Sequence, residues 1–388
     1  IYVRILGKAN FGLYTFAFGI VSLFLLVNGF GAASGVLQYV SKAKNSPKLQ
    51  LSYLRFACLS GGLFNLLISG LIILYALFIP LPVVGAKNVL ILMAFFPVGR
   101  LYIDIFQAYL RATEQNKLQA RFLIINNIIL LAICVIGILY FDLNGLIYFT
   151  YIGYVVMYFI SIWFLKLPSL TKLQANNPIN RREFINYSFF TTLANAFSGL
   201  LFVLDTIVIG YVVKDAKLLA DYKVATIIPF AINFIPNIVI NYYYPKFVQN
   251  SHNAATIRLL AREISRKLFL FSASVSFVLI IAAKPIITII FGSGYVDSIL
   301  PFQIIAFGYW IIATFRTVNG NILAAMGKAK LSFYLTILIL IANIITTYLM
   351  VMHYSINGAA IAIVMMYLFS SILGYVALKL VLRGLQND

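Results

Sequence analysis

The chain is 388 residues long, and 62% of these residues are hydrophobic while only 10% are charged. About a quarter of the residues in a soluble domain carry a charge, so the composition excludes a soluble globular protein. The net charge of +19 suggests nucleic acid binding, but the basic residues lie in alternate loops between apolar runs, as the orientation of a membrane protein requires.

Apolar runs of roughly twenty residues or more recur along the chain, and each is long enough to cross a hydrocarbon layer about 30 Å thick as an α-helix. The sequence therefore predicts an all-α polytopic membrane protein. We expect eleven spanning helices, with the ranges 12–39, 52–79, 89–110, 121–140, 144–165, 186–213, 221–245, 267–292, 297–323, 331–352 and 357–381.

Two of the expected helices are interrupted at the same depth. If Tyr14 is aligned with Tyr222, the break at Asn28-Gly29 meets the break at Pro236-Asn237 without a gap. In transporters, matched Gly/Pro breaks in two halves are the best sequence indication of a substrate site. Because each half has an even number of helices, we expect parallel repeats related by an axis along the membrane normal.

The second half begins with a helix, 186–213, that has no counterpart in the first half. Ile1–Gly7 aligns with Ile209–Asp215, the end of that helix. We therefore expect a first helix to be missing from this sequence, and the complete protein to have two sets of six helices around a central cavity. The expected domains are an N-terminal bundle at 1–166, a cytoplasmic linker with hinge-like prolines at 167–185, and a C-terminal bundle at 186–388.

Loops rich in Lys and Arg alternate with loops that hold few, and the rich set is predicted to be cytoplasmic. This places the C-terminus inside, and the missing helix would place the N-terminus of the complete protein inside too. In one basic loop, Thr256–Leu268 carries Arg258, Arg262 and Arg266 on one helical stripe. Two interpretations stay open: a helix that lies on anionic headgroups, and a solvated cytoplasmic helix.

No catalytic motif, metal-ligand cluster or phosphate-binding loop is recognisable, so we expect neither an enzyme nor a cofactor. The candidate functional residues are charges inside spanning helices, which cost at least about 2.5 kcal/mol at the centre and usually face a cavity. Arg100 lies near the predicted midplane, with Asp104 one turn further on the same face. They form an i,i+4 ion pair inside the bundle or face the cavity, Asp104 then acting in coupling or gating.

Arg316 lies at a similar depth in the corresponding helix of the second half, and no acidic residue stands three or four positions away. A guanidinium stays charged at any relevant pH and fits phosphate oxygens, so Arg316 is a better candidate anion ligand than Arg100. Asp205 has three interpretations: a structural ion pair, which we favour, a ligand for a coupling ion, and a lock between the bundles.

Three asparagines, Asn233, Asn237 and Asn241, are spaced by four and form one polar stripe on the second interrupted helix. The stripe serves either hydrogen bonds between helices or the border of a sugar-sized cavity. Lys223, at the expected outer mouth of the same helix, completes the candidate substrate-binding set.

Three segments resemble the Wzx polysaccharide flippases, which include O-antigen flippases, in the multidrug/oligosaccharidyl-lipid/polysaccharide exporter (MOP) superfamily. The segments are Arg4–Gly7 with Phe11–Tyr14, Leu204–Thr206 with Ile209-Gly210 and Tyr222, and Pro285–Gly292 with Tyr295. Their order and spacing extend the resemblance over nearly the whole chain. The absent first helix and Ala220-Asp221, where the family often has a glycine, depart from the pattern.

The resemblance implies a flippase that moves an undecaprenyl-pyrophosphate-linked oligosaccharide to the outer face of the bacterial inner membrane by alternating access. Family cavities tend to be cationic, and we map this property by depth and charge onto Arg100 and Arg316. The expected partners are the lipid-linked glycan, the bilayer and, as a further candidate, the polysaccharide polymerase; nucleic acid is not expected. The alternatives are a cation-coupled multidrug exporter of the same superfamily and a membrane enzyme that acts on the lipid-linked glycan.

Overall fold

The computed structural model describes residues 2–165 and 179–387, and within these residues it contains helices and no strand. The predicted all-α membrane class is confirmed. Two compact units, Ile1–Val203 and Leu204–Asp388, make up the chain. Their boundary falls inside the helix α7 (Arg181–Val213), whereas the sequence places a linker at 167–185, most of which lies outside the described residues.

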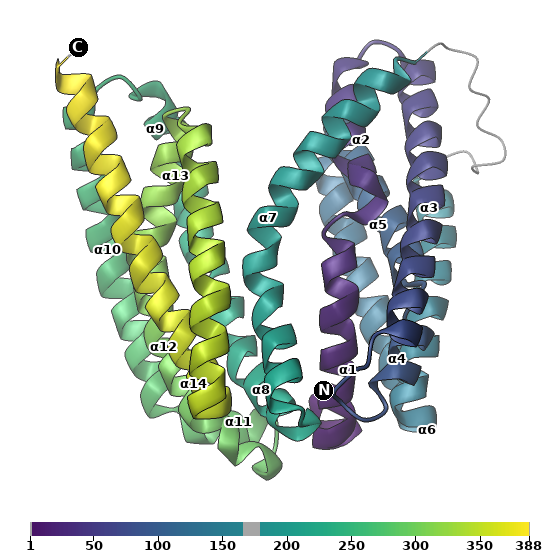
Figure 1. Cartoon of the computed structure of the whole chain (residues 1–388). Helices are drawn as coiled ribbons and strands as arrows, with labels where there is room; N and C mark the ends of the chain where they lie inside the picture. The colour runs from purple at the N-terminus through teal and green to yellow at the C-terminus, as the bar shows by residue number, and fades with distance from the viewer. Residues whose placement is uncertain (1, 166–178, 388) are drawn as a thin grey trace. The chain divides into compact units, whose positions relative to one another are not determined.

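The N-terminal unit is built from six helices, one short 3₁₀ turn and the first part of α7 (Figure 1). The elements are α1 (Tyr2–Leu25), η1 (Asn28–Gly31), α2 (Ala32–Lys42), α3 (Pro47–Phe78), α4 (Ala86–Leu92), α5 (Phe96–Ala112) and α6 (Asn116–Leu165).

The start of α7 belongs to this unit because its side chains pack into the unit's core. The ring of Phe184 stacks on Tyr53, with 5.9 Å between the centroids, and lies 5.6 Å from the ring of Tyr39. All three side chains are buried in one cluster with residues of α2, α3 and α5. Aromatic burial of this kind holds α7 against the N-terminal unit at its first turns.

The C-terminal unit holds the end of α7 and the remaining helices (Figure 1). These are α8 (Ala216–Ile232), α9 (Phe234–Gln249), α10 (Ala254–Ile281), α11 (Ala283–Ile290), η2 (Ser293–Ser298), α12 (Ile299–Ile311), the π-helical turn η3 (Ile312–Arg316), α13 (Thr317–Ala325) and α14 (Ala329–Asn387). One buried apolar cluster joins α9, α10, α13 and the end of α14, and it includes Phe247, Ile264, Ile322 and Leu382.

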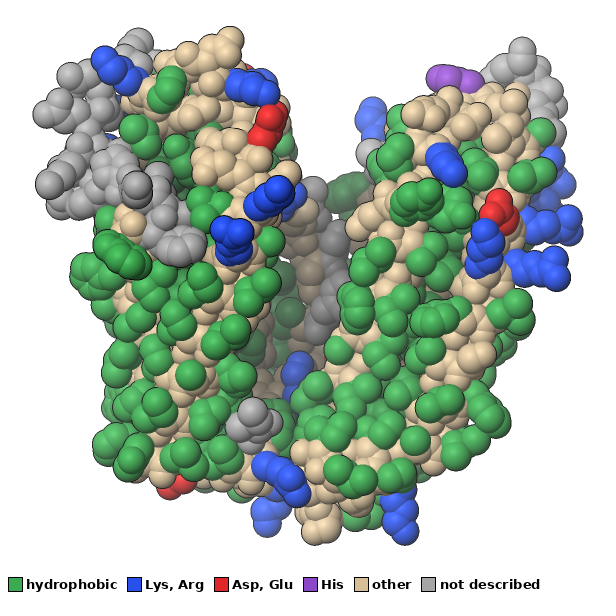
Figure 2. Space-filling model, turned by 180° about the vertical axis from the view of Figure 1, so that it is seen from behind, with side chains coloured by type: hydrophobic (Ala, Val, Ile, Leu, Met, Phe, Trp, Pro, Cys, Tyr) green, Lys and Arg blue, Asp and Glu red, His purple; other side chains and the backbone are tan. Residues whose placement is uncertain are grey.

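Large apolar side chains cover much of the outer surface of both units (Figure 2). On α3, Leu63 and Leu67 are 66% and 67% exposed, and on α10 Phe277 and Ile281 are 65% and 66% exposed. A soluble protein avoids apolar surface of this extent, whereas a bilayer covers it. Within the described residues, seven helices are long and apolar enough to span a membrane, or nine if each of two bent pairs counts as one span.

The longest helices, α6 and α14, each fold back on themselves. In α6 the reversal is at Asp142 (φ 50°), and it brings the Cys134 sulfur within 3.3 Å of the Thr150 hydroxyl. In α14 the reversal is at Ser355 (φ 52°), where a Cβ on Gly358 would lie 1.9 Å from the Met350 carbonyl oxygen. Counting two arms in each brings the spans of the described residues to the expected eleven.

The first predicted break is present as η1, where Gly29, Phe30 and Gly31 all have positive φ. The second break lies at Asn233, between α8 and α9, and the expected position at Pro236-Asn237 is therefore wrong by one turn. The shift follows from proline geometry. In an unbroken helix the ring of Pro236 would clash with the carbonyl of Ile232, four residues earlier, and α8 ends at Ile232.

Candidate functional site

The break in the N-terminal unit is held by an asparagine from another helix. Asn65 on α3, whose side chain is fully buried, accepts a 2.7 Å hydrogen bond from the Gly29 N–H. Its amide donates to the Asn28 side-chain oxygen and to the Pro97 carbonyl, both at 2.6 Å. Backbone groups released by a helix break need hydrogen-bond partners inside a membrane. One asparagine side chain supplies several, because its oxygen accepts hydrogen bonds and its NH₂ group donates two.

The candidate pair Arg100–Asp104 joins this network. Arg100 Nε lies 3.1 Å from Asp104 Oδ1, and Asn28 donates to Asp104 Oδ2 at 3.1 Å. The i,i+4 ion pair inferred as one interpretation is thus formed, on α5. The side chain of Arg100 stays 48% exposed and that of Asp104 29% exposed, so part of the guanidinium remains accessible.

Arg316 in the C-terminal unit ends the π-helical turn η3. Its guanidinium carbon lies 6.0 Å from the ring centroid of Tyr367 on α14, a cation–π contact. Within the described part of the chain it forms no ion pair with a carboxylate, in contrast to Arg100. Single π-helical turns inside α-helices are rare, and they occur frequently at functional sites.

Asp205, near the end of α7, is buried in the core of the C-terminal unit. The Tyr222 hydroxyl on α8 donates to its carboxylate at 3.3 Å, and the Thr347 hydroxyl on α14 donates at 3.5 Å. Thr347 also donates to the Asn343 side-chain oxygen at 2.8 Å. The ion pair favoured from the sequence does not form within the described residues, and hydroxyl groups surround the carboxylate instead.

The asparagine stripe is on the surface of the C-terminal unit. Asn233 is half-buried at the α8–α9 junction, and its carbonyl accepts a 2.9 Å hydrogen bond from the Asn237 amide. Asn237 and Asn241 are exposed, and Lys223 is half-buried on α8. The Asn237 side chain therefore bonds to the backbone at the break, while a role in substrate binding stays a prediction for all four residues.

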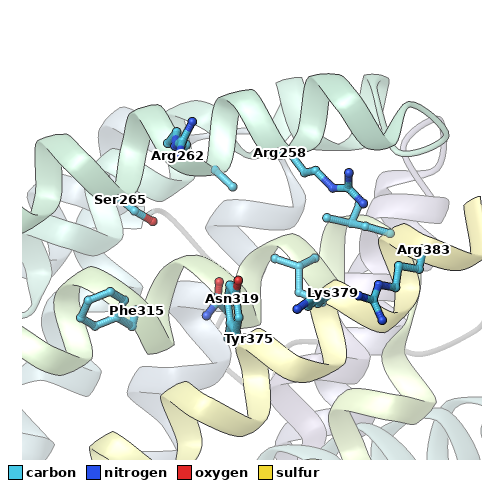
Figure 3. A pocket seen from close by; sticks show the side chains of 11 residues that line it. Arg258, Arg262, Ser265, Phe315, Asn319, Tyr375, Lys379 and Arg383 are labelled. Carbon is cyan, nitrogen blue, oxygen red and sulfur yellow. The ribbon is translucent and has the colours of Figure 1, made fainter. Parts of the chain in front are cut away.

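A pocket that the sequence did not reveal lies between α10, α13 and α14 (Figure 3). Its volume is about 630 Å³. The lining residues are Arg258, Ala261, Arg262, Ser265, Phe315, Asn319, Tyr375, Leu378, Lys379, Leu382 and Arg383. The spacing of four in both basic pairs, Arg258/Arg262 and Lys379/Arg383, was a visible signal, but only the fold shows that the two pairs meet. Within the described residues there is no group of three His, Cys, Asp or Glu side chains that suits a metal ion.

Comparison with known proteins identifies a family and a fold. The profile of a family described as "Polysaccharide biosynthesis protein" matches residues 1–251, more than half of the chain. A multidrug resistance MATE family transporter of the MOP superfamily, solved in an inward-facing conformation, matches with a TM-score of 0.83 at 14% identity, over 100% of this chain and 94% of that one.

Two further solved structures show the same fold. An outward-facing MATE transporter matches with a TM-score of 0.64 at 14% identity, over 100% of this chain and 96% of the other. A MATE in complex with MaD3S matches with a TM-score of 0.67 at 15% identity, over 100% and 91%. A search among curated proteins gave no match. At these identities the structural matches establish the fold alone.

Proposed function

The chain belongs to the polysaccharide biosynthesis protein family, and on this premise we propose that it transports a lipid-linked oligosaccharide across the membrane. The substrate would be an undecaprenyl-pyrophosphate-linked repeat unit, moved from the cytoplasmic to the outer face of the bacterial inner membrane by alternating access. Both termini of the complete protein would be cytoplasmic, with the polysaccharide polymerase as the next protein to receive the glycan. The family and the transporter fold support this proposal.

The observation that carries the proposal is Arg316, an arginine in a spanning helix with no carboxylate partner within the described residues. Placing an unneutralised charge there is costly, and such residues mark substrate or ion pathways. The planar guanidinium presents donors that fit two phosphate oxygens at once, and these charge-assisted hydrogen bonds strengthen away from water. A diphosphate group is the part of the proposed substrate that suits this ligand.

Arg100 would contribute a second, weaker anion ligand from the N-terminal unit. Its Nε faces Asp104, so only the remaining guanidinium N–H groups are available to a substrate. Asp104 would tune this availability, because a conformational change that breaks the ion pair releases the whole guanidinium. Asn233, Asn237, Asn241 and Lys223, two of them exposed and two half-buried, would then bind sugar hydroxyls.

Complementation tests the proposal directly. The full-length gene is expressed in a strain that lacks its own flippase, and surface polysaccharide is measured for strains with different repeat units. Restored polymer with at least one repeat unit supports flipping. Failure with every repeat unit, in cells where the protein reaches the membrane, contradicts it.

A cation-coupled multidrug exporter is the second candidate, and one observation favours it. Asp205 is a buried carboxylate surrounded by hydroxyl and amide oxygens, a set that suits a coupling cation or proton as well as a structural role. Cells that express the protein would then gain resistance to cationic drugs, and Asp205→Asn would abolish that resistance. Unchanged drug sensitivity together with successful complementation excludes this candidate.

A further inference from the structure

The pocket between α10, α13 and α14 has an unusual charge for a cavity in a membrane protein. Of the described residues that line it, four are basic and none is acidic. Arg258 and Arg383 extend from facing helices, with Lys379 beside Arg383 (Figure 3). The nearest acidic residue along α10 is Glu263, which forms an ion pair with Lys267 at 2.5 Å and is not among the residues that line the pocket. Arg262, Lys379 and Arg383 thus bring positive charge to a lining that, among the described residues, contains no carboxylate.

The surroundings of the pocket place it where a lipid headgroup would lie. Along α10, the lining residues Arg258 and Arg262 come before the exposed apolar side chains of Leu270 and Phe277. Along α14, the exposed apolar Ile372 precedes the lining residues at its end. In the space-filling view, basic side chains gather toward the upper end of the unit at the right (Figure 2). The pocket thus adjoins the end of a lipid-facing apolar surface.

The size and chemistry of the lining match a phosphate-bearing headgroup. The volume of about 630 Å³ lies within the range of about 300–1,000 Å³ that small-molecule sites occupy. Asn319, Ser265 and Tyr375 add neutral hydrogen-bonding groups, while Phe315 and Leu378 provide apolar wall for the first carbons of a lipid. Basic pockets between spanning helices on the cytoplasmic side bind anionic headgroups, and the positive-inside rule predicts that side for this end.

We propose that this pocket binds the phosphate groups of an anionic lipid that carries more than one negative charge. Two sources share this chemistry: a bilayer phospholipid with two phosphates, such as cardiolipin, and a polyprenyl diphosphate. The bound anion would reduce the repulsion between Lys379 and Arg383, since like charges four residues apart on a helix are unfavourable. Binding would hold α10 and α14 together at this end of the C-terminal unit. The proposal is independent of flipping, because it requires only a bilayer and an anionic lipid.

The test compares lipid binding by two variants that each lose two positive charges. Arg262→Gln/Arg383→Gln removes one charge from each facing helix of the pocket, whereas the control Arg266→Gln/Lys330→Gln removes two exposed charges outside the lining. Binding of cardiolipin, farnesyl diphosphate, inorganic pyrophosphate and phosphatidylcholine to the purified full-length protein is measured by native mass spectrometry. Gel filtration and circular dichroism verify the fold of each variant.

We expect cardiolipin or farnesyl diphosphate to bind the wild type, and the pocket variant to bind about tenfold or more weakly through lost charge-assisted hydrogen bonds. The control variant keeps wild-type affinity. Preference for cardiolipin identifies a bilayer phospholipid, and preference for farnesyl diphosphate identifies a diphosphate lipid. Equal loss in both variants, or pyrophosphate binding as tightly as the lipids, overturns the proposal. If the double variant misfolds, Arg383→Gln alone, at an exposed position, must still weaken binding.

Discussion

Arg100 and Arg316 differ in how their charge is compensated. Arg100 has a carboxylate 3.1 Å away, whereas Arg316 has the face of Tyr367 at 6.0 Å. An aromatic face stabilises a cation without removing its capacity to donate hydrogen bonds to an anion. Arg316 is for this reason the residue whose replacement is expected to affect transport most.

Arg316→Ala is expected to abolish surface polysaccharide in complemented cells while the protein level stays normal, because the variant loses its anion ligand. Arg316→Lys is expected to restore polymer only in part, since an ammonium cannot bind two oxygens in the fork geometry of arginine. Polymer is measured on gels and protein by immunoblot, with Lys284→Ala, an exposed position on α11, as the control. Wild-type polymer from the alanine variant removes Arg316 from the site.

Asn65→Leu is expected to destabilise the protein, because Asn65 holds the N-terminal break. The replacement leaves the Gly29 N–H without its acceptor at a buried position, which costs about 1–3 kcal/mol. The thermal midpoint in detergent should fall by several degrees, whereas Asn88→Leu, at an exposed position on α4, should leave it nearly unchanged. Equal midpoints for both variants would show that Asn65 does not hold the break.

At the scale of elements, the N-terminal break depends on backbone conformations that only some residues adopt. Gly31 has a φ of 77°, and it begins the contact between α2 and α7. A Cβ at this position would lie 2.0 Å from the Thr192 hydroxyl oxygen and 2.3 Å from the Ser188 carbonyl oxygen. The break and the packing of α7 therefore require the same glycine.

Gly31→Ala is expected to lower the yield and the thermal midpoint of the protein strongly, because both the backbone conformation and the space oppose a methyl group. Gly70→Ala is the matched control: its Cβ would meet nothing within 4 Å in the interior of α3. The control should be neutral or slightly stabilising. A Gly31→Ala protein as stable as the control would mean that α7 packs differently from the arrangement described.

At the scale of the whole molecule, each unit combines broken and folded-back helices into a compact bundle with an apolar outer surface. The same end of the C-terminal unit holds the basic pocket, the first turn of α14 with Lys330, and the last turns of α14. Its predicted cytoplasmic location depends on the distribution of Lys and Arg among the loops, which sets the orientation of membrane proteins.

Cysteine labelling tests this orientation with little background, because Cys58 and Cys134 are both 1% exposed. A membrane-impermeant maleimide added to spheroplasts is expected to label Lys87→Cys and not Lys330→Cys. Both lysines are exposed, so accessibility of the side chain is not limiting. Permeabilised cells should show labelling of Lys330→Cys as well. The reverse pattern in intact spheroplasts would place the basic loops outside.

Local patterns in the sequence determined the spanning helices, their number, the existence of two breaks and the Arg100–Asp104 pair. Each of these depends on residues close in the chain: an apolar run of sufficient length, a proline or glycine within it, or two charges one turn apart. The one-turn error at the second break arose because proline acts on the carbonyl four residues before it.

The tertiary structure alone decided which distant residues meet. It placed Asn65 at the break of another helix, surrounded Asp205 with hydroxyl groups from α8 and α14, and brought Arg258 and Arg262 to the same pocket as Lys379 and Arg383. A helix exposes several faces of similar polarity in a membrane, and the hydrophobic pattern does not say which face packs against which neighbour. The close fit of small residues and hydrogen-bonding side chains makes that choice, and it exists only once the helices are in contact.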